Sequence, residues 1–211
     1  LHNLPYKSIK AYQMQEVIDK CGCGYSTQGA IKNLFGQLDC YAMELDIIVK
    51  MNSSLIHAAP IPPSSKVPFT EEEIQSVWDI ECQEWCDSVL FLLYTGFRIG
   101  EMLTIEKANV DLEQMMVKGG IKTKAGKDRI VPIHPRIQKF VKQRMTEPGK
   151  YLFSYNGKKL STSQYYIFWN RVMDELKIHH TPHECRHTFR SRLDSAGANK
   201  VCIDLMMGHK S

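Results

Sequence analysis

Two arginine motifs, far apart in the sequence, hold the residues best suited to chemistry. The segment Thr181–Arg190 reads TPHECRHTFR and sets His183 three residues before Arg186, so a helix would put both side chains on one face. Arg98 lies 88 residues before Arg186, just after a glycine, in the segment TGFRIGE. Planar guanidinium groups bind phosphate oxygens through paired hydrogen bonds. The pattern predicts a phosphate pocket, provided that folding brings the two motifs together.

Other charged residues could complete this pocket. Glu101 follows Arg98 by three residues, and it either forms an ordinary ion pair within a helix or orients the guanidinium. Four cationic residues of the segment 122–132 either form a solvated hairpin tip or contact a DNA backbone: Lys122, Lys124, Lys127 and Arg129. A lysine beside a leaving oxygen can also donate a proton. His209 alone would indicate a surface histidine, and only its occurrence together with the other motifs makes it a candidate catalytic residue.

The segment 183–187 also fits HExxH, in which two histidines bind zinc and the glutamate is the base of a peptidase. Metzincins have glycine and histidine three and six residues after the second histidine, where this chain has Arg190 and Leu193. No glutamate follows Glu184, so the third ligand of gluzincins is missing. A zinc peptidase is therefore a remote alternative, and we predict neither a metal nor another cofactor.

Charge is distributed unevenly along the 211 residues, although the net charge is only +4. Residues 71–113 include eleven acidic and two basic side chains, whereas residues 114–150 include ten basic and two acidic ones. A basic block indicates a polyanionic partner, although a solvated charged surface gives the same pattern. Seven cysteines without a repeated CxxC pattern indicate free thiols in a reducing cytoplasm. No apolar run reaches the length of a membrane span.

A proline-rich stretch divides the chain. Residues 59–68 contain four of the nine prolines, which predicts an extended linker between a domain of residues 1–58 and a domain of residues 69–211. In the first domain, apolar residues repeat at helical period over 6–20 and 31–48. Two helices bury little surface, so we expect further helices before the first residue, or a partner, to cover them.

The second domain is predicted to be mainly helical with one small antiparallel β-hairpin. Thr70 and Glu73 have the spacing of a capping box, which starts the first helix. Residues 115–133 change to a two-residue period, which predicts the hairpin. The remaining periodic segments predict helices: 71–94 as a helical hairpin, 98–104, 136–144, 162–176, 183–195 and 200–206.

Together these motifs resemble the tyrosine recombinase (phage integrase) family, in particular the integrases of conjugative transposons. TGFRIGE matches the family's first arginine motif, and Thr181–Phe189 matches its HxxR box, with Cys185 where leucine is usual. Gly208 and His209 match its GH box, and Lys124 matches the catalytic lysine on its β-hairpin. The resemblance covers about residues 68–211. The first domain resembles the family's helical core DNA-binding domain less specifically.

The resemblance implies a mainly α fold with a small antiparallel β-sheet. It implies a site-specific recombinase that cuts and rejoins DNA through a 3′-phosphotyrosine intermediate and so integrates and excises a mobile element. The residues expected at the site are catalytic Arg98, Lys124, His183, Arg186 and His209, supporting Glu101, and DNA-binding Lys122, Lys127, Arg129 and Arg190. The expected partners are double-stranded DNA, three further copies of the chain in a synaptic tetramer (a monomer or dimer otherwise), and an accessory DNA-bending or excision factor. We expect a cytoplasmic bacterial protein that joins the nucleoid when bound to DNA.

One element of the family pattern is missing. The nucleophilic tyrosine of the family follows the GH box, but this sequence ends two residues after His209. We therefore expect an inactive fragment whose nucleophile lies outside it. Tyr165 and Tyr166 precede the HxxR box and are interpreted as helix packing. The alternatives are an integrase-like DNA-binding protein that does not cut, and a metal-dependent transposase or nuclease, which would need clustered carboxylates.

Overall fold

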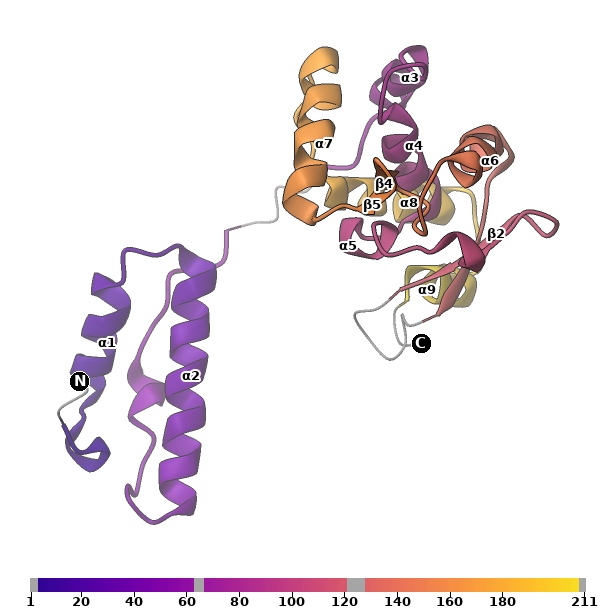
Figure 1. The fold of residues 1–211 in the computed structure, drawn as a ribbon. Helices are drawn as coiled ribbons and strands as arrows, with labels where there is room; N and C mark the ends of the chain where they lie inside the picture. The colour runs from indigo at the N-terminus through magenta and orange to yellow at the C-terminus, as the bar shows by residue number, and fades with distance from the viewer. Residues whose placement is uncertain (1–3, 63–66, 121–127, 209–211) are drawn as a thin grey trace. The chain divides into compact units, whose positions relative to one another are not determined.

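The computed structural model describes residues 4–62, 67–120 and 128–208. It divides the chain into two compact units, Leu1–Ser65 and Lys66–Ser211 (Figure 1). The fold is mainly helical with small antiparallel sheets, as predicted. None of the helices in the described part of the chain is long and apolar enough to cross a bilayer.

The first unit is built from two helices around a small core. α1 spans Ala11–Lys20, and α2 spans Tyr25–Glu44. The predicted apolar stripe continues to residue 48, but the helix ends earlier because Asp46 has a left-handed φ of 53°. The core consists of buried apolar side chains from the helices and their flanking segments: Ile9, Met14, Ile18 and Ile56.

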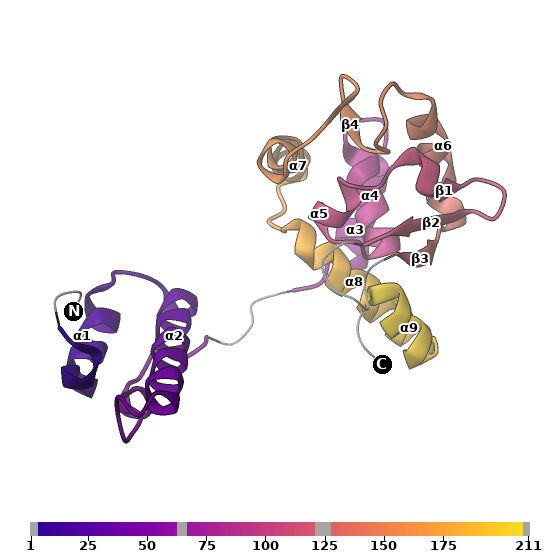
Figure 2. The same cartoon turned by 60° about the horizontal axis from the view of Figure 1, so that its bottom comes forward.

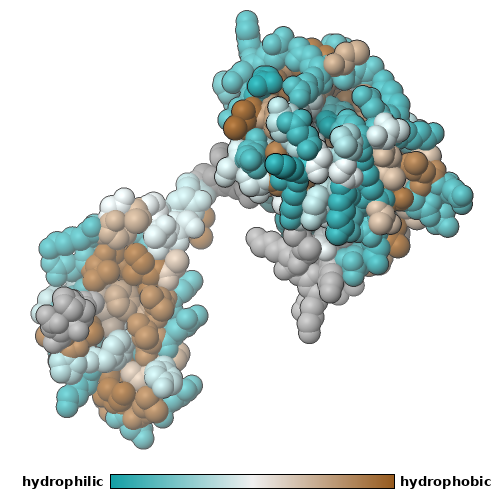
Figure 3. All heavy atoms as spheres, in the orientation of Figure 1, coloured by the Kyte–Doolittle hydropathy of each residue, from teal (hydrophilic) through white to brown (hydrophobic). Residues whose placement is uncertain are grey.

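Apolar side chains remain exposed on this unit. Figure 3 shows apolar residues gathered on one face of it. Five of the exposed side chains belong to α2: Tyr25, Leu34, Leu38, Tyr41 and Met43. The predicted stripe on α2 is therefore only partly buried, at Ile31, Phe35 and Ala42. That another element covers this face, and that residues 1–58 bind DNA, both stay predictions.

The second unit is assembled around a central helix, α4. Every residue of α4 except Asp87 is buried, which explains its nearly continuous apolar sequence. α4 packs against α8, and α9 follows α8 at one end of the unit (Figures 1 and 2). The helices of this unit are α3 (Glu71–Asp79), α4 (Cys86–Thr95), α5 (Ile99–Met102), α6 (Gln138–Thr146), α7 (Thr162–Leu176), α8 (Pro182–Ser195) and α9 (Lys200–Met207).

Two small antiparallel sheets complete the second unit. The first has the order β1 (Val110–Asp111), β2 (Met116–Gly119) and β3 (Arg129–Pro132). β2 and β3 form the predicted hairpin, in register at Val117 with Val131 and at Gly119 with Arg129. Val117 and Val131 are fully buried, while Ile130 points to solvent, as the two-residue period requires.

Short strands outside this hairpin were not predicted. β1 pairs with β2, and β4 (Ser154–Tyr155) pairs with β5 (Lys158–Lys159). Each of these three strands has only two residues, so none repeats its alternation often enough to give a periodic signal.

Candidate active site

A tight turn between α4 and α5 positions Arg98. Gly96 caps α4 with a left-handed φ of +64°, and a Cβ at this position would lie 2.4 Å from Cδ1 of Phe189 on α8. Glycine is needed here for both the backbone conformation and the close contact. Arg98 then becomes the N-cap of α5, with its side chain about a quarter exposed.

Glu101 fixes Arg98 through both of its carboxylate oxygens. The Arg98 guanidinium donates from Nη1 to Oε1 at 2.9 Å, and the Arg98 backbone N–H donates to Oε2 at 2.8 Å. Glu101 is only 2% exposed. The two interpretations left open by the sequence are therefore compatible, because one carboxylate both pairs with Arg98 and orients it.

Arg186 connects the two arginine motifs. It is 3% exposed, and its Nη1 donates to the carbonyl of Gly96 at 2.6 Å, two residues before Arg98. Its Nη2 donates to the carbonyl of Met207 at the end of α9. Segments separated by 88 residues thus meet at one place, as the sequence predicts.

Arg129 joins the same group from β3. Its Nη2 donates to Oε2 of Glu101 at 2.7 Å, and its guanidinium lies 4.3 Å from the ring centroid of Phe97. We expected this residue on a solvated or DNA-facing hairpin, but it is 6% exposed and turned toward Glu101. Its predicted contact with DNA stays a prediction. We call Arg98, Glu101 and Arg129 the pocket cluster.

The charges of the pocket cluster and of the neighbouring Arg186 affect one another. Burial, followed by repulsion from Arg98 and Arg129, lowers the pKa of Arg186 to about 10, so it remains a cation at neutral pH. Burial alone would raise the pKa of Glu101, but hydrogen bonds from Arg129 and Arg98 outweigh it and lower that pKa. Two guanidiniums therefore pair with one carboxylate and the guanidinium of Arg186 adds a third cation nearby, for a net charge of +2. Such a site attracts an anion.

His183 faces the open side of this group. It is exposed at the start of α8 and lies edge-on to His187, with ring centroids 4.9 Å apart. It borders a cavity of about 430 Å³, whose other lining residues are Arg98, Ile99, Gly100, Glu101, Thr162 and Tyr166. The cavity thus combines two of the predicted catalytic residues with their supporting glutamate.

Two lining residues on α7 were missed from the sequence. Thr162 and Tyr166 both border the cavity, and Tyr166 also packs against the core. Its neighbour Tyr165 is fully buried, with its hydroxyl 2.8 Å from that of Ser88. The packing interpretation therefore holds for Tyr165 and describes only part of Tyr166. A helical period distinguishes buried from exposed faces, but it does not indicate which exposed face borders a pocket.

The HExxH pattern has a different local structure. Glu184 accepts the backbone N–H of Thr181 at 2.5 Å and lies 3.3 Å from Nδ1 of His180, so it closes the N-terminus of α8. The ring of His180 stacks on Phe69, with centroids 3.9 Å apart. Among residues 4–62, 67–120 and 128–208, no three His, Cys, Asp or Glu side chains form a group suited to a metal ion.

Of the remaining predicted site residues, only Arg190 is among the residues that the structure describes. Arg190 lies on α8 with its Nε 3.6 Å from Asp194 and its Nη2 3.9 Å from Asp204. Four other predicted residues lie outside the described residues: Lys122, Lys124, Lys127 and His209.

Comparison with known proteins gives a match to one family. A sequence profile of the phage integrase family matches residues 69–211, the greater part of the chain. The chain belongs to the phage integrase family. Its match lies within the second unit, so all of the site described above is part of the integrase domain.

Individual integrases and recombinases are also similar. The tyrosine recombinase XerA of Pyrococcus horikoshii is 29% identical over 160 residues, which cover 71% of this chain and 55% of that protein. The chain therefore spans about half the length of this relative. The solved Tn1549 transposon integrase in complex with a circular intermediate DNA has a TM-score of 0.82 at 22% identity, over 98% of this chain and 80% of that one. A lambda integrase tetramer bound to a Holliday junction has a TM-score of 0.79 at 14% identity, over 100% and 68%.

Proposed function

We propose that the protein is a site-specific DNA recombinase that cuts and rejoins DNA through a 3′-phosphotyrosine intermediate. The observation that carries this proposal is the meeting of Arg98 and Arg186 beside Glu101 in a site of net charge +2. A DNA phosphodiester has one negative charge, and a second develops as a nucleophile adds to phosphorus. The net charge of the site matches that of this transition state. An enzyme accelerates a reaction by stabilising the transition state more strongly than the bound substrate.

The proposed catalytic residues divide into three roles. Arg98 and Arg186 hold the non-bridging oxygens and stabilise the charge that develops on them. Lys124 protonates the departing 5′-oxygen, and His183 and His209 donate hydrogen bonds to the phosphate or assist proton transfer from a tyrosine. The covalent phosphotyrosine conserves the energy of the phosphodiester, so rejoining needs no nucleotide cofactor.

The proposed partner is double-stranded DNA, gripped mainly through its backbone and therefore in a salt-dependent way. The Tn1549 integrase and lambda integrase structures contain DNA, and the lambda integrase is a tetramer on a Holliday junction. We propose that this protein likewise forms a tetramer when two duplexes are exchanged, and that its biological role is the movement of a mobile element.

The central test uses the full-length protein, because the proposed tyrosine follows the GH box. A randomised duplex library is incubated with the protein, and DNA that becomes attached in an SDS-resistant way is sequenced to find the target. Arg98→Ala and Arg186→Ala should lower cleavage of that target by about 10³-fold and leave binding within a few-fold. Binding without any covalent adduct would replace this proposal by a DNA-binding protein that does not cut.

Lys124 has its own test. A target in which sulfur replaces the bridging 5′-oxygen releases a group that needs no proton. Lys124→Ala should cleave the normal target slowly and the sulfur-substituted target at the wild-type rate. Slow cleavage of both targets would exclude the general-acid role.

A further inference from the structure

We propose that Arg129 is a positioning residue, which acts through Glu101 to hold the guanidinium of Arg98 in place for phosphate. This inference rests on the proposed function for its substrate and on the geometry of the pocket cluster for its mechanism. Arg129 lies on a β-strand and 28 residues after Glu101, so its part in the site is visible only in the fold.

The carboxylate of Glu101 needs a second partner to stay in place. Arg98 is about a quarter exposed, so its long side chain has room to move. The side chain of Arg129 is only 3% exposed, and it reaches Glu101 from β3 at 2.7 Å. Arg129 is the partner of this carboxylate from outside the turn that carries Arg98, so without it the hydrogen bonds described here to Glu101 would all come from Arg98 itself. The Arg98 guanidinium would then lose its fixed direction.

The surroundings of Arg129 are built to hold a flat cation. Its guanidinium stacks on the ring of Phe97, which follows the glycine turn directly. Gly119 pairs with Arg129 across the hairpin, and a Cβ there would lie 2.9 Å from Cε1 of Phe97. A larger residue at position 119 would displace the ring that supports the arginine. Lysine has neither the planar group nor the fork of donors, so it would replace Arg129 only in part.

A purely structural role explains Arg129 poorly. Within the described residues, its Nε and Nη1 are buried and have no hydrogen-bond partner. Burying such donors costs folding free energy. Its charge also adds to the repulsion that lowers the pKa of Arg186. An apolar side chain of similar volume would avoid both costs, so the function of the cation is to be sought in the site rather than in the core.

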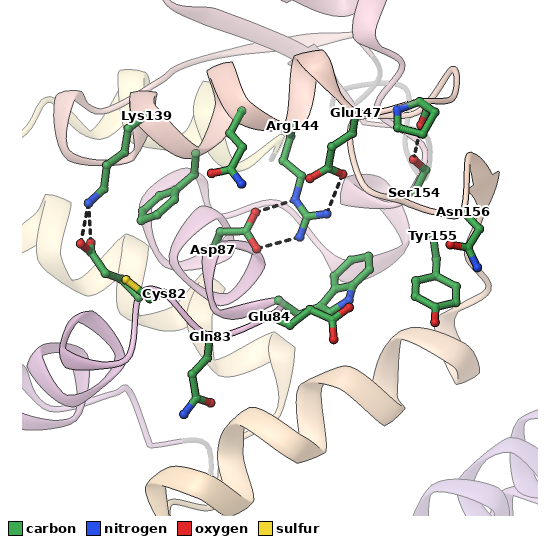
Figure 4. Close-up of a pocket in the computed structure, with 15 residues that line it drawn as sticks. Cys82, Gln83, Glu84, Asp87, Lys139, Arg144, Glu147, Ser154, Tyr155 and Asn156 are labelled. Atoms are coloured by element: carbon green, nitrogen blue, oxygen red, sulfur yellow. Dashed lines mark hydrogen bonds and ion pairs between the residues drawn. The ribbon is translucent and has the colours of Figure 1, made fainter.

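The chain offers a matched control, the Arg144 cluster of Arg144, Asp87 and Glu147. Arg144 is also a buried arginine that pairs with carboxylates, at 2.6 Å and 2.8 Å to Asp87 and 2.9 Å to Glu147. Its guanidinium also lies over an aromatic ring, 4.5 Å from the centroid of Trp85. Figure 4 shows these residues beside a separate cavity, which shares no lining residue with the one at Arg98.

The experiment compares Arg129→Met, Arg129→Lys and Arg144→Met in the full-length protein. Single-turnover cleavage of the selected target, DNA affinity and the folded fraction are measured for each. Arg129→Met should cleave about tenfold more slowly per folded molecule, the same loss as expected for Glu101→Gln, with DNA affinity within a few-fold of wild type. Arg129→Lys should recover part of that loss, and Arg144→Met should cleave at the wild-type rate.

A double-mutant cycle tests whether Arg129 acts through Glu101. In a Glu101→Gln background, Arg129→Met should add little further loss, because the connection is already broken. Full additivity of the two losses would overturn the inference, and so would wild-type cleavage by Arg129→Met.

A second readout separates this inference from the proposed function. Binding of inorganic phosphate, followed by ³¹P NMR, requires no DNA cleavage. If the wild-type protein cuts no DNA, the recombinase proposal fails, but Arg129→Met should still weaken phosphate binding several-fold while Arg144→Met does not. Unchanged phosphate affinity in Arg129→Met would then overturn the positioning role.

Discussion

The pocket cluster and the Arg144 cluster use the same side chains in opposite proportions. In the Arg144 cluster, one guanidinium pairs with two carboxylates and donates three short hydrogen bonds to them. In the pocket cluster, one carboxylate pairs with two guanidiniums, and Arg186 adds a third cation nearby. The Arg144 cluster has more carboxylates than guanidiniums, so its arginine needs no further partner. The pocket cluster with Arg186 has more guanidiniums than carboxylates, so it can bind an additional anion.

This difference separates stability from binding. A buried ion pair contributes little net stability, but removing one partner leaves an uncompensated charge and is costly. In the Arg144 cluster, the arginine is the only cation, so its loss should lower the free energy of unfolding. In the pocket cluster, the removal of one arginine relieves repulsion, so it should lower the rate of cleavage more than the stability. The comparison therefore predicts opposite phenotypes for similar substitutions.

The largest effect is expected at the exposed end of the pocket cluster. Arg98→Met should lower cleavage by about 10³-fold, because a charge that contacts the phosphate is lost. The free energy of unfolding should change by less than about 1 kcal/mol, because a partly exposed ion pair contributes little. Cleavage kinetics and urea denaturation measure the two quantities. A large loss of stability without loss of cleavage would break the comparison.

The next effect is expected at the Arg144 cluster. Arg144→Met should lower the free energy of unfolding by about 3 kcal/mol, because the largely buried carboxylate of Asp87 and the partly exposed one of Glu147 lose their partner. Urea denaturation measures this loss. Combining it with Asp87→Asn should restore part of the stability, since one of the two unpaired charges is then removed. A loss as small as that of Arg98→Met would show that the two clusters do not differ.

A smaller effect on both readouts is expected for Glu101→Gln. Glutamine keeps the shape and one acceptor but removes the only negative charge of the pocket cluster. Cleavage should fall about tenfold and the free energy of unfolding by about 1–3 kcal/mol. Glu106→Gln is the matched control, because Glu106 pairs with the exposed Lys150 at 2.8 Å. Equal effects in the two variants would remove the special status of Glu101.

The smallest effect concerns acid stability. The pKa of Glu101 is lower in the folded protein than its ordinary value, so its stabilising contribution is present above about pH 4.3 and is lost as the pH falls through the folded value. Glu101→Gln has no such group and should lose stability less steeply below pH 4. Thermal melting between pH 6 and pH 2.5 checks this, and identical slopes would contradict it.

The sequence predicted the parts of the fold with strong local signals. α7 spans the predicted residues 162–176, because a capping box starts it and the apolar period continues throughout. α5 is shorter than predicted and ends at Met102, since sequence patterns specify the ends of a helix less well than its existence. The two-residue strands were missed because their pairing depends on partners distant in sequence.

The site shows the same division. The meeting of Arg98 and Arg186 was predicted because both belong to motifs that the family resemblance connects. The burial of Arg129 was not predicted, because a cation in a basic hairpin is normally solvated. Its contacts with Phe97 and Glu101 depend on the fold. Tyr166 was assigned to packing alone, since the helical period does not indicate which partly exposed residues also border a cavity.

The two halves of the phosphate site differ in how mutation can reach them. Arg98 is held by a side chain, so a single codon change at position 101 can release it. Arg186 is held by main-chain carbonyls at Gly96 and Met207, which every amino acid possesses. No substitution can delete those acceptors; only a shift of the chain can. The position of Arg98 thus depends on the identity of one neighbouring side chain, whereas that of Arg186 depends on the path of the backbone, which a substitution changes only indirectly, as a side chain at Gly96 would.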